Sequence, residues 1–226
     1  MFTILLRVVP DAVVLGLVLF AAAGTLAWPR AWVLLAALCA VRLATAVAVF
    51  HVHPTLLRER AYVLMHREQP WADKAILLAF MATAFLGVPV IAALDVFRWH
   101  VLPSPPPFVS AAGLVLFLLG WIITALALRE NAFAVTVVRL QSERRHTVVD
   151  TGVYAVIRHP MYAGNPLVLL GLSLWLGSYT SAVFACIPLA LLLVRIALEE
   201  RFLQRALPGY RDYMKRVPYR LLPGVW

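Results

Sequence analysis

The sequence is poor in charged residues and in cysteine, and both shortages narrow the class of protein. Charged residues make up 14% of the 226 residues, hydrophobic residues make up 63%, and the mean hydropathy is +0.86. Because soluble domains carry about a quarter charged residues, this composition excludes an ordinary soluble domain. The two cysteines, Cys39 and Cys186, lie in separate apolar runs, so they indicate neither a disulfide framework nor a cysteine-based metal site.

Several signatures of other functions are also missing. The chain contains no phosphate-binding loop, no dinucleotide-binding glycine fingerprint and no Gly-x-Ser-x-Gly elbow. His51, His53 and His66 lack the partners and spacing of a metal site, so no metal is expected. The net charge of +9 does not indicate nucleic acid, because the arginines flank apolar runs. There they favour the anionic headgroups of membrane lipids.

Six apolar runs are candidates for transmembrane helices, which need roughly 20 residues each. Continuous runs are typical of helical membrane proteins, whereas strands of outer-membrane barrels alternate apolar and polar residues. The fifth run is short, and only the turn at 177–179 separates it from the sixth, which predicts a tight helical hairpin. We therefore predict an all-α polytopic membrane protein with six transmembrane helices, or five if the fifth run stops part-way. The runs are Leu5–Ala27, Ala31–Phe50, Lys74–Phe97, Phe108–Leu128, Met161–Gly177 and Thr180–Leu198.

The arginines predict which side of the membrane each connection faces. Residues 51–73, 129–160 and 199–226 are basic, whereas the intervening turns carry little positive charge. The positive-inside rule then places both termini and these three segments in the cytoplasm. We expect 129–160 and 199–226 to form a cytoplasmic cap. The basic residues are almost all arginines, which is typical of GC-rich prokaryotic genomes and suggests a prokaryotic inner (plasma) membrane.

A polar cluster, Arg158-His159-Pro160-Met161-Tyr162, directly precedes the fifth apolar run. Proline is favoured in the first turn of a helix, so Pro160 predicts a helix start. A helix N-terminus offers backbone donors to anionic groups, and ionisable residues beside a membrane are functional candidates. An interfacial anchor, with a snorkelling arginine and a tyrosine of the aromatic belt, is the alternative interpretation.

Arg195 and Glu199 lie four residues apart at the end of the sixth run, so they share one helical face. They fit an ordinary ion pair at the membrane boundary. They fit equally a ligand site in which the arginine holds a carboxylate through its planar fork. The spacing leaves both interpretations open.

Two segments together resemble a known family. Residues 141–164 read Gln-Ser-Glu-Arg-Arg-His-Thr-Val-Val-Asp-Thr-Gly-Val-Tyr-Ala-Val-Ile-Arg-His-Pro-Met-Tyr-Ala-Gly. The ending reads Arg195-Ile-Ala-Leu-Glu-Glu-x-x-Leu203, then Gly209-Tyr-x-x-Tyr-x-x-x-Val-Pro218. In this order the two segments closely resemble the isoprenylcysteine carboxyl methyltransferases, and the resemblance covers roughly residues 129–226. We treat 1–226 as a single membrane domain, with N-terminal transmembrane helices in 1–128 and a methyltransferase core in 129–226.

The resemblance implies a cytoplasmic pocket for S-adenosylmethionine. Carried over by position, it assigns the substrate carboxylate to Arg195, which would act as both the substrate-binding and the catalytic residue. It implies cofactor contacts from Gln141, His146, Thr147, Val148, Val149, Tyr154, His159, Pro160, Met161, Tyr162 and Glu199.

The resemblance thus implies methyl transfer to a lipophilic acceptor that enters from the bilayer, with an isoprenylcysteine-like carboxylate as the expected acceptor group. Such a carboxylate is already ionised and needs no base, so alignment supplies most of the rate gain. Three alternatives stay open. The acceptor could be a phospholipid amine or a small thiol, with Glu200 as the acid or base that an amine needs. The protein could be an NADPH-dependent membrane reductase of the sterol reductase type, with Arg144 and Arg145 for the 2′-phosphate. It could also be a non-enzymatic lipid-binding or scaffolding protein.

Overall fold

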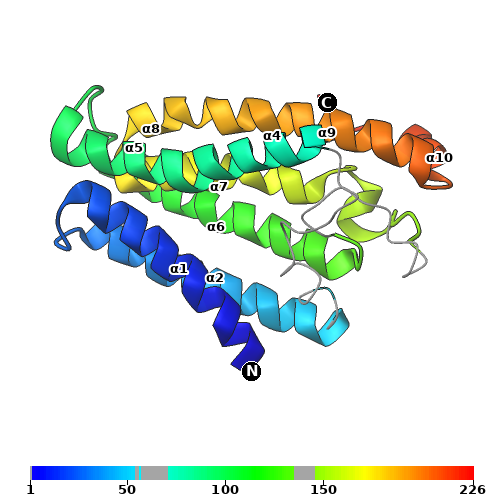
Figure 1. Cartoon of the computed structure of the whole chain (residues 1–226), viewed down its shortest axis with the longest axis horizontal. Helices are drawn as coiled ribbons and strands as arrows, with labels where there is room; N and C mark the ends of the chain where they lie inside the picture. Colours follow the sequence, from blue (N-terminus) through cyan, green and yellow to red (C-terminus); the bar gives the residue numbers. More distant parts are fainter. Residues whose placement is uncertain (1, 54–55, 57–70, 135–145) are drawn as a thin grey trace.

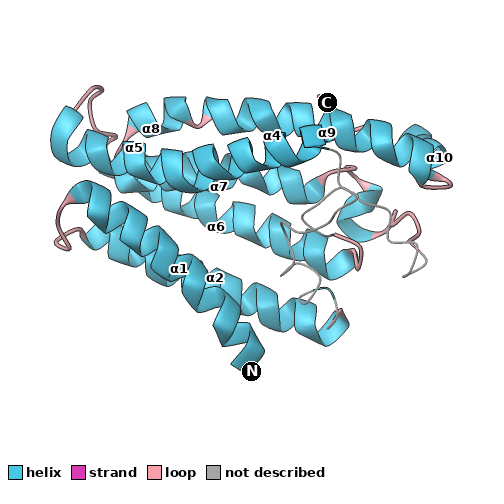
Figure 2. Cartoon of the chain, in the orientation of Figure 1, coloured by secondary structure: helices cyan, strands magenta, loops and turns pink. Residues whose placement is uncertain are grey.

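The computed structural model describes residues 2–53, 56, 71–134 and 146–226, and within them every regular element is helical (Figures 1 and 2). The all-α prediction is therefore confirmed, and each predicted apolar run lies on a helix. The helices are α1 (Phe2–Ala23), α2 (Pro29–Val52), α4 (Trp71–Met81), α5 (Val88–Leu94), α6 (Pro107–Glu130), α7 (Pro160–Leu176), α8 (Tyr179–Phe184), α9 (Cys186–Ala206) and α10 (Tyr210–Arg216). Two π-helical segments, Ala82–Gly87 and Asp95–Trp99, continue α4 and α5, and Gly152–Ala155 forms a 3-10 turn.

Four helical stretches in the described part of the chain are long and apolar enough to cross a membrane. They are Pro29–Val52, Trp71–Trp99, Pro107–Glu130 and Tyr179–Ala206. Helix α7 has 17 residues, which agrees with the expectation that the fifth run is short. The outward faces carry exposed hydrophobic side chains such as Leu17, Phe85 and Ile122, as expected of surfaces that contact lipid.

Some predicted boundaries are wrong, for local reasons. Helix α1 ends at Ala23 instead of Ala27, because Gly24 adopts a left-handed conformation with a φ of 73°. The sixth run divides into α8 and α9 because Pro188 has no N–H to donate to the carbonyl of Phe184. Helix α9 then continues to Ala206, so the first residues of the predicted 199–226 cap are helical.

The predicted helical hairpin between α7 and α8 is confirmed. Gly177 ends α7 with a φ of 96°, and the Ser178 hydroxyl caps α8 by accepting from the Ser181 N–H at 2.9 Å. The same Ser178 hydroxyl donates to the buried carboxylate of Asp95 at 2.7 Å. The turn is thus tied to the end of the long Trp71–Trp99 stretch.

Helices α6 and α7 pack at unusually close range through glycines. Gly113 and Gly120 on α6 face Gly171 and Gly164 on α7, so the two helices run antiparallel. A Cβ added at Gly171 would lie 2.5 Å from the Phe117 backbone nitrogen and 2.6 Å from the Gly113 carbonyl oxygen. Both glycine pairs are spaced by seven residues, which keeps them on one helical face. We call these four residues the glycine interface.

The polar connections gather at one end of the bundle. Figure 1 shows α10 and the segment that precedes α7 at this end, while the turns at 24–28, 100–106 and 177–178 lie at the opposite end. Helix α9 packs along α4, and its last turns reach the polar end. The fold therefore brings the two segments that carry the family resemblance together.

Candidate active site

A cavity of about 760 Å³, including the part open to solvent, lies at the polar end of the bundle. Its walls come from the residues that follow α6, from 146–162, from the end of α9 and from α10. Most of the predicted cofactor contacts line it: His146, Thr147, Val148, Val149, Tyr154, His159, Met161, Tyr162 and Glu199. Pro160 starts α7 next to them without lining the cavity, and Gln141 lies outside the described residues.

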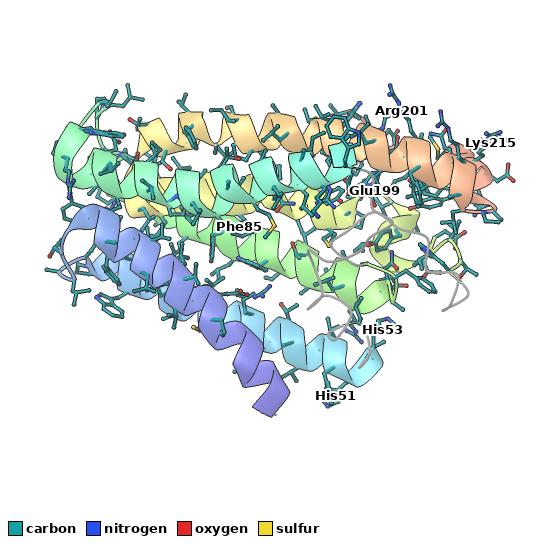
Figure 3. The ribbon with its side chains drawn as sticks, in the orientation of Figure 1. His51, His53, Phe85, Glu199, Arg201 and Lys215 are labelled. Carbon is teal, nitrogen blue, oxygen red and sulfur yellow. The ribbon has the colours of Figure 1, made fainter. Side chains whose placement is uncertain are left out.

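Glu199 faces the cavity from α9 and is held by the first turn of α7. Its Oε2 accepts a hydrogen bond of 2.7 Å from the Tyr162 hydroxyl, and the Tyr162 ring stacks on His159 with centroids 5.6 Å apart. Figure 3 shows Glu199 on the inner side of α9, whereas Arg201 and Lys215 project outward from this end. The cavity thus combines a carboxylate with flat aromatic faces.

Helix α7 begins at Pro160, as predicted. The backbone N–H groups of Tyr162 and Ala163 both donate to the carbonyl of His159 at 3.0 Å. The expectation that the amides after Pro160 would point at a ligand is therefore wrong for these two.

Glu200, one residue after Glu199, lies behind the cavity and joins three basic side chains. Its side chain is 2% exposed. Oε1 accepts from Arg158 Nε at 2.7 Å and lies 3.2 Å from His159 Nε2, while Oε2 accepts from Arg220 Nε at 2.8 Å. We call Arg158, His159, Glu200 and Arg220 the Glu200 cluster. A buried carboxylate with these partners is not available as the acid or base for an amine acceptor.

The C-terminal tail pairs with the segment that enters α7. The N–H groups of Arg158 and His159 donate to the carbonyls of Tyr219 and Arg220, both at 2.9 Å. Arg158 Nη1 also donates to the Val217 carbonyl at 2.6 Å. The tail therefore fixes the position of two cavity-lining residues, Arg158 and His159.

Helix α10 closes the cavity with two buried tyrosines. Gly209 starts this helix with a φ of 81°, and the Tyr213 hydroxyl donates to the carbonyl of Tyr154 at 2.8 Å. Burial raises the pKa of Tyr210 and the pKa of Tyr213 above their ordinary value of 10.0, so both are neutral hydroxyls at physiological pH.

Arg195 does not line the cavity. It is 3% exposed, and its Nε lies 3.4 Å from Oδ1 of Asp73, a buried residue in the first turn of α4. Its guanidinium carbon lies 5.8 Å from the ring centroid of Tyr162, which does line the cavity. Asp73 is not among the site residues predicted from the sequence. The available signal was an acidic residue directly before an apolar run.

Comparisons with known proteins agree with this architecture. Residues 108–208 match the model of the phospholipid methyltransferase family. Protein-S-isoprenylcysteine O-methyltransferase B of Arabidopsis thaliana is 31% identical over 49% of this chain and 58% of the plant protein. The chain thus spans less than two thirds of that relative. Protein-S-isoprenylcysteine O-methyltransferase of Dictyostelium discoideum is 25% identical over 84% of this chain and 76% of that protein.

A solved structure shares the fold. It is a eukaryotic intramembrane Ras methyltransferase, isoprenylcysteine carboxyl methyltransferase, and it matches with a TM-score of 0.54 at 21% identity. The match covers 93% of this chain and 74% of the other. The resemblance seen in the sequence is therefore confirmed: this integral membrane protein is similar in sequence to isoprenylcysteine carboxyl methyltransferases and shares the fold of one of them.

Proposed function

We propose that this protein transfers a methyl group from S-adenosylmethionine to the carboxylate of a lipophilic, isoprenylcysteine-like acceptor. The observation that carries the proposal is the cavity at the polar end. Most of the residues that the family resemblance assigns to the cofactor come from separate parts of the chain and line this one cavity: His146 to Val149, Tyr154, His159, Met161, Tyr162 and Glu199.

The chemistry of the cavity walls suits the cofactor. Phe133, Tyr154 and Tyr210 offer faces on which a base can stack. The Glu199 carboxylate can accept hydrogen bonds from hydroxyl or ammonium groups. When bound, S-adenosylmethionine supplies a methyl group on a sulfonium, which a carboxylate can attack without a base.

The task of the protein is then to hold two reactants in line. Glu199 and the Glu200 cluster fix the cofactor side, through the Tyr162 hydroxyl and through the paired tail. Arg195 lies against Tyr162, beside this cavity, and is the basic group proposed for the acceptor carboxylate. Alignment at near-contact distance supplies most of the available rate gain, and a partly dry site favours a reaction in which charge is neutralised.

The membrane arrangement supports a lipophilic acceptor. We propose six transmembrane helices, with the polar end, the basic segments and both termini in the cytoplasm of a prokaryotic cell, as the arginine distribution predicts. A lipid-soluble acceptor would reach the site sideways from the bilayer. The water-soluble cofactor would enter from the cytoplasmic side, through the cap of 129–160 and 199–226.

Two alternatives are less well supported. An amine acceptor would need an acid or base, and Glu200 is occupied by three basic side chains. A reductase would need a site for the 2′-phosphate of NADPH. Arg144 and Arg145, the pair considered for this phosphate, lie outside the described residues. Among the described residues that line the cavity, the arginine is Arg158, and it is bound to Glu200 and to the Val217 carbonyl.

Calorimetry on the detergent-purified protein tests whether it is a methyltransferase or a reductase. S-adenosylhomocysteine should bind, and NADPH should not. Methyl transfer from labelled S-adenosylmethionine to N-acetyl-S-farnesylcysteine, with phosphatidylethanolamine as the amine comparison, then tests the acceptor. Binding of NADPH alone would identify a reductase, and methylation of the amine alone would reject the carboxylate.

A further inference from the structure

The buried pair of Asp73 and Arg195 bears on how the acceptor is selected. Asp73 is 4% exposed and Arg195 3% exposed, and they join α4 to α9 at 3.4 Å. Removing two charges from water costs several kcal/mol per ion, and a close partner of opposite sign offsets that cost. In this structure the arginine proposed for the acceptor therefore already has a carboxylate beside it.

The charges around Tyr162 add a second argument. Tyr162 contacts the Arg195 guanidinium with its ring and donates to Glu199 with its hydroxyl. Two carboxylates thus lie close to one guanidinium: Asp73 pairs with Arg195 directly, and Glu199 is linked to it through Tyr162. An acceptor carboxylate that approaches Arg195 would meet the like charge of Asp73, which opposes its binding.

We propose that Asp73 is a specificity-determining residue that competes with the acceptor carboxylate for Arg195. The inference rests on the proposed function. Asp73 stabilises the buried arginine before the acceptor binds, and the acceptor binds by displacing or sharing this interaction. The affinity for the acceptor then depends on how much more strongly Arg195 binds the acceptor carboxylate than it binds Asp73. Anions that lack a well-packed lipid group would bind too weakly to displace Asp73.

The same helical stretch offers a matched control. Asp95 is 3% exposed and starts the π-helical segment Asp95–Trp99 of the same Trp71–Trp99 stretch. This segment leads into the turn at 100–106, at the opposite end of the bundle. There it accepts hydrogen bonds from the Ser178 hydroxyl at 2.7 Å and from the Val101 N–H at 2.9 Å. Asp95→Asn makes the same chemical change in a buried aspartate, away from the cavity.

The experiment measures steady-state methylation of N-acetyl-S-farnesylcysteine and its inhibition by the corresponding carboxamide, which carries no charge. Asp73→Asn should lower the KM for the carboxylate by about fivefold or more. The inhibition constant of the carboxamide and the affinity for S-adenosylhomocysteine should stay within about twofold of wild type. Asp95→Asn should leave all three values unchanged.

An unchanged or raised KM in Asp73→Asn, with normal affinity for S-adenosylhomocysteine, would overturn the proposal. So would an equal gain for the carboxamide. If Asp73→Asn fails to fold, Asp73→Glu serves instead, because it keeps the competing charge on a longer side chain. This variant should raise the KM for the carboxylate. An unchanged or lower KM would also overturn the proposal. If wild type binds no S-adenosylhomocysteine, the proposed function itself fails. Cofactor binding without an effect at Asp73 rejects this inference alone.

Discussion

The glycine interface and the Glu200 cluster hold segments together by opposite means. The interface, made of Gly113, Gly120, Gly164 and Gly171, brings two backbones into contact with no charged group. The cluster joins α9, the start of α7 and the tail through charge-assisted hydrogen bonds of 2.7 to 3.2 Å. One region depends on shape, and the other depends on ionised groups.

The difference follows from the surroundings of each region. Lipid tails are as apolar as leucine, so helices inside a membrane associate by close packing and benefit from small residues. At the polar end, residues 156–159 between the 3-10 turn and Pro160 are not helical, and their backbone groups need partners from elsewhere. The tail supplies them, and Glu200 fixes the tail. Close packing therefore holds the helices of the scaffold together, and charge-assisted hydrogen bonds hold the walls of the cavity in place.

The largest expected effect comes from Glu200→Ala, which breaks the cluster. The substitution leaves Arg158 without its buried counter-charge, and removal of one partner of a buried pair costs about 3–5 kcal/mol. Chemical denaturation in detergent should show this loss of stability, together with loss of S-adenosylhomocysteine binding in calorimetry.

Glu199→Ala is the matched control, because the neighbouring residue lines the cavity instead of lying behind it. This variant should lose cofactor affinity with a much smaller loss of stability. Equal destabilisation by both variants would contradict the distinction between a wall residue and a residue that supports the wall.

A smaller effect is expected from Gly171→Ala, which breaks the glycine interface. The new methyl group would meet backbone atoms of α6 at 2.5 and 2.6 Å, and overpacking costs about 1–3 kcal/mol. Gly16→Ala is the control, since its methyl group would lie 3.3 Å from a flexible Leu35 side chain. Thermal unfolding should show a lower midpoint for Gly171→Ala alone. Equal midpoints for the two variants would show that the interface tolerates a side chain.

The helices and the cavity walls were predictable because their signals are local. The apolar runs are helical, although the sixth is divided into α8 and α9, and Pro160 starts α7 because proline suits the first turn. Partners between distant segments were not predictable in this way. Asp73 is found beside Arg195 only once α4 packs along α9, and the glycines of α6 are matched only once α7 lies antiparallel to it.

The pair Glu199-Glu200 shows most clearly what the sequence alone does not predict. The sequence placed both acids after an apolar run and left Glu200 as a candidate base. The structure continues α9 through both residues. Since successive residues of an α-helix point about 100° apart, one acid reaches the cavity and the other reaches the tail. This separation depends on the end of α9, which the hydropathy placed too early.

The smallest expected effect is a sensitivity of the polar end to alkaline pH. Burial raises the pKa values of Tyr210 and Tyr213 above 10.0, the ordinary value, which they regain in the unfolded chain. Below about pH 10 the folded and the unfolded chain both keep these protons, so the two tyrosines contribute fully to the free energy of unfolding. Above it the unfolded state loses them first, and stability falls by at most about 1.4 kcal/mol per pH unit for each tyrosine.

Calorimetry between pH 8 and pH 11 should therefore show weakening affinity for S-adenosylhomocysteine at the alkaline end, because α10 closes the cavity. The helix content measured by circular dichroism should stay constant, because the glycine interface has no group that titrates. A Tyr210→Phe, Tyr213→Phe double variant should lose the bond to the Tyr154 carbonyl. The affinity of this variant for S-adenosylhomocysteine should be lower at neutral pH and should change less as the pH rises. If the affinity of the double variant falls with pH as in wild type, another group causes the alkaline loss of affinity. The contrast between a charge-dependent end and a shape-dependent scaffold then does not extend to these tyrosines.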